Sequence, residues 1–319
     1  MSLMVDHFVR IEWIACPLCH TREEKPFFEV EDTTGWMPQK HYRLVRCLRC
    51  DLVYLNPRPV EEEAAKFYET DRYLPFVSSH GRELTGLEKW YARLRRWNSR
   101  WKRKQIEKFH RKGRILDVGC GTGEFLHEMV THGWEGRGVE RDPDAVHHAI
   151  ETLKLRVYAG SIETMPTAAA SFDVVTMWHV LEHLYAPHRA LQKVRDLLTP
   201  GGVLVIAVPN VQSIDAKAYR RRWVALDLPR HVQFFNLKSL RMLCEMHKFS
   251  FMAVKNLPLD SLFNAWMSEH GNAQRLWLRP LAYLRAGLIA QAALLCGWLK
   301  PGKTRFLGST LLTFWKKDQ

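Results

Sequence analysis

The chain has 319 residues, of which 46% are hydrophobic, so it is long enough to bury the core of one full domain and a smaller module. Its seven cysteines include two tight pairs, a pattern that favours metal ligation in a reducing compartment and argues against a secreted disulfide scaffold. The formal net charge is +13, and the N-terminus carries an early acid, Asp6, and no continuous apolar segment. We therefore expect a cytoplasmic protein without a secretory signal.

Two C-x-x-C motifs stand near the start of the chain. Cys16 and Cys19 form the first motif, Cys47 and Cys50 form the second, and 27 residues separate them. Four thiolates at this spacing can hold one tetrahedral ion, usually a structural zinc ion. A redox motif would need only one such pair, at the start of a helix.

The segment between the two motifs indicates a small β-module. Residues 27–30 and 42–46 have the composition of short strands, and residues 33–36 have that of a turn. These features predict a zinc ribbon over residues 1–60. A module of this size buries too little apolar surface to fold alone, so the ion should carry its folding, and chelation should loosen it before the main domain.

Residues 61–112 are predicted to form a helical linker. Positive charge is concentrated at residues 89–114, which contain twelve Lys or Arg and one acid. Trp90, Trp97 and Trp101 recur at helical spacing, which predicts an amphipathic basic helix with an aromatic stripe. Three interpretations stay open: a solvated basic face whose tryptophans pack on the core, a surface for an anionic membrane or a phosphate-bearing substrate, and an RNA-binding surface.

The next segment, residues 114–124, predicts a buried strand that runs through a glycine turn into a helix. Its glycines are Gly119, Gly121 and Gly123. A dinucleotide-binding G-x-G-x-x-G motif counted from the first of these would need a glycine where Glu124 stands. The spacing therefore argues against NAD.

Two acids accompany this turn. Asp117 closes the strand, where a carboxylate would repel a pyrophosphate but suits a cationic ligand such as S-adenosylmethionine, with its sulfonium and ammonium charges. Glu140 stands 23 residues later at the end of the next apolar segment, where an acid can accept from both ribose hydroxyls. The three glycines and the two acids together predict a binding site for S-adenosylmethionine.

With these residues the chain resembles the class I S-adenosylmethionine-dependent methyltransferases. Residues 172–184 are similar to that family's fourth strand and following helix, and residues 197–206 to the turn into its fifth strand, so the resemblance extends over residues 110–256. The family often has an acid after the third strand that accepts from the adenine amino group, and this chain has a serine there. The resemblance implies three further cofactor contacts, at Ser161, Ile162 and Trp178.

The main domain, residues 113–319, alternates strand and helix patterns, which predicts a doubly wound α/β fold with helices on both faces of a parallel sheet. In the family topology this is a seven-stranded Rossmann-like sheet whose last strand is antiparallel. Ligands of such sheets bind beyond the carboxyl ends of the strands. The expected strands are residues 114–118, 136–140, 156–159, 172–178, 203–208, 249–255 and 308–315.

Residues 258–303 are predicted to be a helical insertion between the last two strands. Within it, residues 286–299 are almost entirely apolar, but this stretch is shorter than the roughly 20 residues that cross a bilayer. We expect a buried or dimer-forming helix; the alternative is an interfacial membrane helix or a lid over a lipid-linked substrate.

Methyl transfer is an in-line displacement at a sulfonium carbon, so alignment is the main task, and a base is needed only if the acceptor must lose a proton. Histidine suits that role, and His231 and His179 are the leading candidates because both should lie near the ligand end of the sheet, with His183 one helical turn further on. Glu182 and His183 with His188 would suggest a metal-dependent RNA-end methyltransferase, but their spacing lacks the E-x-x-H pattern.

Residues 50–59 resemble the exit from the ribbon in bacterial methyltransferases with an N-terminal zinc module, several of which act on sugars. The favoured function is therefore S-adenosylmethionine-dependent methyl transfer to a small biosynthetic acceptor, such as a sugar, nucleotide-sugar or lipid-linked glycan. One alternative is an RNA methyltransferase that grips RNA with the ribbon and the basic helix. Another is a non-catalytic zinc-ribbon adaptor, against which the intact glycine turn and both acids argue. A homodimer and peripheral membrane contact are further expectations.

Overall fold

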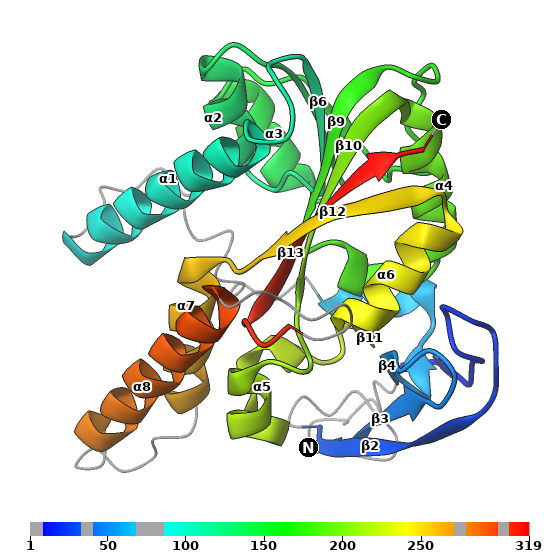
Figure 1. The fold of residues 1–319 in the computed structure, drawn as a ribbon, viewed down its shortest axis with the longest axis vertical. Helices are drawn as coiled ribbons and strands as arrows, with labels where there is room; N and C mark the ends of the chain where they lie inside the picture. Colours follow the sequence, from blue (N-terminus) through cyan, green and yellow to red (C-terminus); the bar gives the residue numbers. More distant parts are fainter. Residues whose placement is uncertain (1–8, 33–40, 68–85, 271–278, 299–305, 319) are drawn as a thin grey trace, which may run out of the picture.

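The computed structural model describes residues 9–32, 41–67, 86–270, 279–298 and 306–318, so the turn predicted at residues 33–36 lies outside the described residues. Its centre is a seven-stranded sheet in the order β12–β13–β10–β9–β6–β7–β8 (Figure 1). The strands are β6 (Arg114–Val118), β7 (Glu135–Glu140), β8 (Val157–Ala159), β9 (Phe172–Trp178), β10 (Leu198–Pro209), β12 (Phe249–Lys255) and β13 (Thr310–Lys317).

The directions of these strands confirm the predicted Rossmann-like sheet. β8, β7, β6, β9 and β10 pair in parallel, whereas β13 lies antiparallel between β10 and β12. β10 begins earlier than predicted, because Leu198 already pairs with Phe172 before the register shifts to Val203 opposite Val174. The carboxyl ends of the five parallel strands therefore meet at one edge of the sheet.

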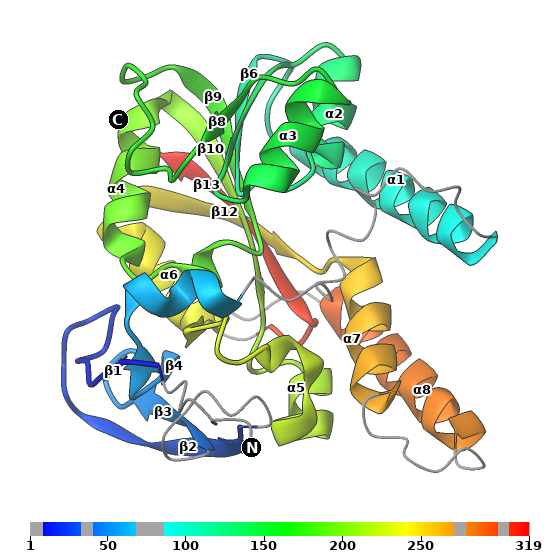
Figure 2. The ribbon, with the colours of Figure 1, turned by 180° about the vertical axis from the view of Figure 1, so that it is seen from behind.

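Helices cover both faces of this sheet (Figures 1 and 2). α1 (Gly86–Ile106), α2 (Glu124–Thr131) and α3 (Pro143–Glu151) lie on one side, and α4 (Pro187–Leu197) and α6 (Leu237–Met246) lie on the other. α6 starts at the predicted N-cap: Asn236 Oδ1 accepts from Ser239 N at 2.9 Å, and Ser239 Oγ accepts from Asn236 N at 3.1 Å.

The basic helix α1 packs on the core with its second half. Ile106 is buried, and Trp101 packs against the same apolar cluster. The expectation that the tryptophans pack on the core is wrong for Trp97, which is 46% exposed, because the first half of α1 extends away from the sheet (Figure 1). The side chain of Trp90 lies outside the described residues.

The N-terminal module is joined to the main domain by a shared sheet. β2 (Glu24–Glu31), β3 (His41–Cys47) and β4 (Val53–Leu55) form the expected ribbon, and β11 (Gln233–Phe234) from the main domain adds a fourth strand beside β4. A second pair, β1 (Ile11–Glu12) and β5 (Arg58–Pro59), closes the module before the 3-10 helix Glu61–Phe67. The ribbon is therefore continuous with the main domain.

The connection from β10 to β11 contains α5 (Ile214–Tyr219) and two 3-10 turns, Arg220–Arg222 and Val224–Leu226. It passes close to the ribbon, because the ribbon strand β2 contacts the first of these turns.

The insertion folds as two packed helices, α7 (Pro258–His270) and α8 (Arg279–Trp298). Only one face of α8 is buried, through Ala286, Ala290 and Ala293. The expectation of a buried helix is therefore wrong for its other face. No helix among the described residues is long and apolar enough to cross a membrane. The exposed face of α8 carries four leucines that are each 60–65% exposed: Leu281, Leu284, Leu288 and Leu295.

Candidate active site

The glycine turn lies at the carboxyl ends of β6 and β7. Gly119, Gly121 and Gly123 have φ angles of 67°, 53° and 89°, in the left-handed region that favours glycine. A Cβ on Gly119 would lie 2.5 Å from Val180 Cγ2, and one on Gly123 would lie 2.6 Å from Leu155 Cδ1, so packing also requires glycine at both positions. A Cβ on Gly121 would meet no atom within 4 Å, so the space beside Gly121 is open to a ligand.

The two predicted acids lie at the ends of neighbouring strands. Asp117 is 2% exposed, and its Oδ1 accepts from Thr176 Oγ1 at 2.6 Å. Burial raises the pKa of Asp117 to about 7, against the opposing effect of the Thr176 hydroxyl. Glu140 ties the turn to β7, because its Oε2 accepts from Gly121 N at 2.8 Å. Asp117 is thus a buried carboxylate that a cationic ligand would stabilise.

α1 brings a lysine into this site. Lys102 Nζ lies 4.2 Å from the ring centroid of Trp178, the last residue of β9. Burial lowers the pKa of Lys102, and the charges of Asp260 and Asp117 oppose this shift. From the sequence Lys102 is one of many cations on a basic face, and its inward direction depends on where the helix docks, so no local pattern distinguishes it.

These residues fit S-adenosylmethionine. Asp117 and Lys102 offer opposite charges to the ammonium and carboxylate of its amino-acid part. Trp178 Nε1 is buried and has no hydrogen-bond partner among the described residues, so it is a donor that a ligand could satisfy. Ser161 and Ile162 follow β8, next to the strand that ends at Glu140. The Ile162 side chain is buried in the core, so it would contact adenine through its backbone.

His179 follows Trp178 and is held between two carboxylates. Its Nδ1 lies 3.1 Å from Glu182 Oε1, and its Nε2 lies 3.0 Å from Asp260 Oδ2. Burial alone would lower the pKa of His179, but the two carboxylates, Asp260 foremost, raise it to about 10. Both ring nitrogens are therefore engaged as donors, an arrangement that suits a cationic positioning residue. Asp260 comes from the insertion, and no sequence pattern points to it.

His231, the other predicted catalytic residue, lies beside His183. Their ring centroids are 4.5 Å apart in a T-shaped contact, and the backbone N of Val232 donates to Glu182 O at 3.0 Å. Burial, followed by the charge of His231, lowers the pKa of His183 to about 4. The fold thus gathers His179, Glu182, His183 and His231 next to the predicted cofactor residues, and both sets of roles stay predictions.

A family model described as a methyltransferase domain matches residues 90–253, about half of the chain. The chain belongs to this methyltransferase domain family. This confirms the family predicted from the glycine turn and its two acids.

Relatives of the methyltransferase domain include ubiquinone biosynthesis O-methyltransferases. That of Idiomarina loihiensis is 29% identical over 168 residues, which cover 49% of this chain and 69% of that protein. That of Coxiella burnetii is 30% identical over 101 residues, which cover 30% of this chain and 43% of that protein. The chain spans about half the length of the first curated relatives it matches, such as those of Coxiella burnetii, Paraburkholderia phymatum and Cereibacter sphaeroides.

Solved structures of the same kind are similar at lower identity. A Burkholderia thailandensis 1,6-didemethyltoxoflavin-N1-methyltransferase, with S-adenosylhomocysteine bound, is 17% identical and has a TM-score of 0.48; the match covers 85% of this chain and 98% of that one. A methyltransferase from Archaeoglobus fulgidus is 19% identical with a TM-score of 0.44, over 69% of this chain and 92% of that one.

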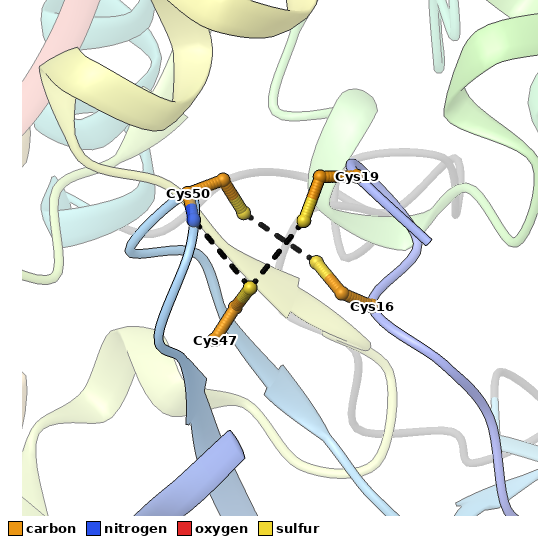
Figure 3. A group of neighbouring side chains, drawn as sticks. All are labelled: Cys16, Cys19, Cys47 and Cys50. Atoms are coloured by element: carbon orange, nitrogen blue, oxygen red, sulfur yellow. Dashed lines mark hydrogen bonds between the residues drawn. The ribbon is translucent and has the colours of Figure 1, made fainter. Parts of the chain in front are cut away.

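The four predicted metal-binding cysteines converge on one point (Figure 3). The Sγ atoms of Cys16 and Cys50 are 3.5 Å apart and those of Cys19 and Cys47 are 3.4 Å apart, too far for disulfides, whose sulfurs lie about 2 Å apart. Two ligands of a tetrahedral zinc ion lie roughly 3.8 Å apart. The residue after each second cysteine, His20 or Asp51, has a positive φ of 59° or 66°, so the two motifs form matching turns.

A cleft of about 780 Å³ lies between the ribbon and α5. Its wall includes Val211 and Gln212, which follow β10, so the cleft begins at the ligand edge of the sheet. The cleft contains one acid, Asp51, whose Oδ1 lies 3.3 Å from Arg46 Nη1. The lining otherwise combines aromatic and cationic side chains: Phe27, Phe28 and Trp223 with Arg46, Lys217, Arg220 and Lys238.

Proposed function

We propose that the protein transfers a methyl group from S-adenosylmethionine to a small, anionic biosynthetic acceptor in the cytoplasm. The observation that carries the proposal is the buried carboxylate of Asp117 beside the open face of Gly121, since a cationic ligand satisfies the first and fills the second. S-adenosylmethionine supplies an activated methyl group on a sulfonium. The residues of the chain then have to bind and align the two reactants.

Each cofactor residue has a defined task in this proposal. Asp117 binds the ammonium and Lys102 the carboxylate of the amino-acid part. Glu140 accepts from the ribose hydroxyls, and Ser161 and Ile162 line the adenine. Trp178 would donate from its partnerless Nε1 to the same ligand.

The cleft favours an acceptor with a phosphate or diphosphate group, such as a nucleotide-sugar or lipid-linked glycan. Four of its lining side chains are cationic and one is acidic, which suits an anionic group. Its aromatic side chains can stack on a base or a sugar face. The curated relatives are named O-methyltransferases, which favours oxygen as the methylated atom.

In O-methylation the acceptor oxygen bonds to the methyl carbon, the carbon–sulfur bond breaks with its electron pair on sulfur, and the hydroxyl proton leaves. His231 is the residue proposed to take that proton or to orient the acceptor. His179 is the weaker candidate for a base because both of its nitrogens already meet carboxylates.

We also propose that Cys16, Cys19, Cys47 and Cys50 hold a structural zinc ion. The support is the chemistry of the donor set: four thiols, three of them buried, share one point without forming disulfides.

Ion pairs weigh against RNA as the acceptor. Arg95 pairs with Glu124 at 2.7 Å, and Arg103 pairs with Glu128 at 2.9 Å, so these cations of the basic helix bind the protein's own α2. The expected homodimer and peripheral membrane contact stay predictions, which light scattering and liposome flotation test.

Calorimetric titration with S-adenosylmethionine and S-adenosylhomocysteine tests the proposal. Asp117→Ala and Glu140→Ala should each weaken binding by about 1.5–3 kcal/mol, the scale of a charged hydrogen bond. The control is Glu135→Ala, an exposed acid at the start of the same strand as Glu140. Unchanged affinity in both test variants excludes the cofactor site.

The same titration, repeated with nucleotide-sugars and with total RNA, identifies the acceptor class. Cofactor affinity altered by nucleotide-sugars alone supports the cleft, and alteration by RNA alone supports the RNA alternative. No cofactor binding in the folded protein supports the adaptor.

A further inference from the structure

We propose that Glu182, His183 and His231 form a second metal site, which binds a divalent transition-metal ion on the acceptor side of the cofactor pocket. Each residue offers one ligand atom, and these three atoms lie within 4.8 Å of one another. Ligand atoms about 2.0–2.2 Å from a common ion lie roughly 3–4 Å apart, so only a small closure is needed.

The two imidazoles are oriented as metal ligands are. His183 Nδ1 donates to Arg230 O at 3.1 Å, and His231 Nδ1 donates to Ala225 O at 2.9 Å. A carbonyl oxygen can only accept, so each neutral ring carries its proton on Nδ1 and its lone pair on Nε2. This outer hydrogen bond fixes the tautomer and the ring orientation of metal-binding histidines.

The carboxylate of Glu182 is a second, independent observation that indicates a metal ion at this point. Its side chain is 1% exposed, and His179 Nδ1 contacts only its Oε1, at 3.1 Å. Its Oε2 is buried and has no hydrogen-bond partner among the described residues. A carboxylate oxygen buried in this way is unfavourable unless a donor or a cation meets it. A metal ion at this point would satisfy it.

The donor set indicates the class of ion. Two imidazole nitrogens and one carboxylate suit manganese, iron, cobalt, nickel or zinc, whereas magnesium and calcium prefer an all-oxygen set. Asp227 Oδ2, 3.9 Å from His231 Nε2, could complete the set directly or through water. His188, the histidine next in sequence to this cluster, lies elsewhere, with its two nitrogens 2.9 Å from His247 Nε2 and Leu18 O.

The site has a function within the proposed methyl transfer, and this part of the inference rests on that proposal. Three protein ligands leave coordination positions for the acceptor. A hydroxyl held there loses its proton more readily, and the proton passes to solvent. With the ion bound, His231 acts as a ligand and His179 positions Glu182.

Metal binding is tested on the full-length protein, without any acceptor. Mild chelation should remove exchangeable ions while one equivalent of zinc stays on the cysteines. Cobalt(II) is then added and followed by visible absorption. We expect one further equivalent to bind, with the weak d–d bands of nitrogen and oxygen ligands and without a thiolate charge-transfer band. No such equivalent on the wild-type protein overturns the proposal.

Three variants assign the ligands: His183→Gln, His231→Gln and Glu182→Gln. Each should weaken cobalt binding roughly tenfold or more, the scale on which even supporting residues of a metal site act. The control is His147→Gln, an exposed histidine on α3, which should bind cobalt as the wild type does. Cobalt binding that is unchanged in all three variants refutes the assignment.

Cofactor titration of the same samples separates the two proposals. A variant that binds S-adenosylmethionine normally is folded, so its loss of cobalt binding is local. Cobalt binding without cofactor binding in the wild type would refute the methyltransferase proposal and still support the metal site. If every variant fails to fold, the cobalt spectrum of the wild-type protein still shows whether a further metal ion binds.

Discussion

Removing the ion from the four cysteines should disturb the main domain as well as the ribbon. The sequence predicts that chelation loosens the module first, but the structure joins module and domain in one sheet. Tyr54 and Val53 of β4 pair with Gln233 and Phe234 of β11, and Leu55 N donates to Val232 O at 3.0 Å. An unfolded ribbon would release these partners.

The magnitude follows from what the two parts share. Leu18, Val45 and Leu52 of the module are buried in the same apolar cluster as the main domain, and each contributes about 1.5–3 kcal/mol. Asn236 Nδ2 donates to Asp51 O at 2.9 Å, and such hydrogen bonds add about 1 kcal/mol each. These terms reach about 6–10 kcal/mol, comparable with the 5–15 kcal/mol that stabilises a typical domain. The module and the domain should therefore unfold together.

Hydrogen exchange before and after zinc release measures this coupling. Release by a mercurial thiol reagent, followed with a zinc-sensitive dye, should give one equivalent of zinc and expose the amides of Gln233 and Phe234, which pair with β4. The amides of β6 in the centre of the sheet serve as the internal reference. Protection of Gln233 and Phe234 that survives complete zinc release would refute the coupling.

Four further predictions concern the pocket. Because the pKa of Asp117 is raised to about 7, this carboxyl ionises between pH 6 and 8. The affinity for the cofactor's ammonium should therefore rise about tenfold over that range. Calorimetry should find no such rise in Asp117→Asn. Because the pKa of Asp117 is raised from 3.8 to about 7 on folding, the folded state binds the extra proton between these values. The free energy of unfolding of the unliganded protein should therefore fall as pH rises from about 4 to about 7 and level off above it. A difference between wild type and Asp117→Asn that is flat over this range contradicts the prediction. His179→Gln should lower the free energy of unfolding by about 2–3 kcal/mol in denaturant titrations, because it breaks two charged hydrogen bonds of a side chain that is 35% exposed. The control is the exposed His147→Gln, which should leave the free energy of unfolding unchanged. Lys102→Met should weaken the binding of S-adenosylhomocysteine roughly tenfold or more. The binding of methylthioadenosine, which lacks the carboxylate, should be unaffected, and equal losses for both ligands would exclude Lys102 from carboxylate binding. The exposed Lys104→Met is the control.

Local patterns were sufficient to predict where the structure places the proposed cofactor residues. The glycine turn, Asp117 and Glu140 lie within one strand–turn–helix–strand unit, where hydrophobic periodicity and glycine positions determine the geometry. The strand at residues 249–255 and the helix capped by Asn236 are found as predicted for the same reason. The cysteine pairs converge because the strands between them, β2 and β3, pair antiparallel.

The acceptor side could not be predicted, because it depends on packing between distant segments. His231 meets His183 across 48 residues of sequence, and Asp260 reaches His179 from the insertion across 81. β11 has only two residues, too few to show a strand period, yet it joins the ribbon to the domain. Lys102 faces inward only because its helix docks beside α2. Such contacts have no local signature.

These long-range contacts support a function of the predicted zinc ribbon in the proposed site. Leu55 N donates to Val232 O at 3.0 Å, and Val232 N donates to Glu182 O at 3.0 Å, so two backbone hydrogen bonds connect the ribbon, through the loop, to the 3-10 turn Leu181–His183. His231 precedes Val232, and His183 follows Glu182, so a shift of β4 would displace both histidines. Held imidazoles need a rigid support, which a long loop alone does not provide. A chain that lost the ribbon would keep its cofactor residues and lose the alignment of its acceptor.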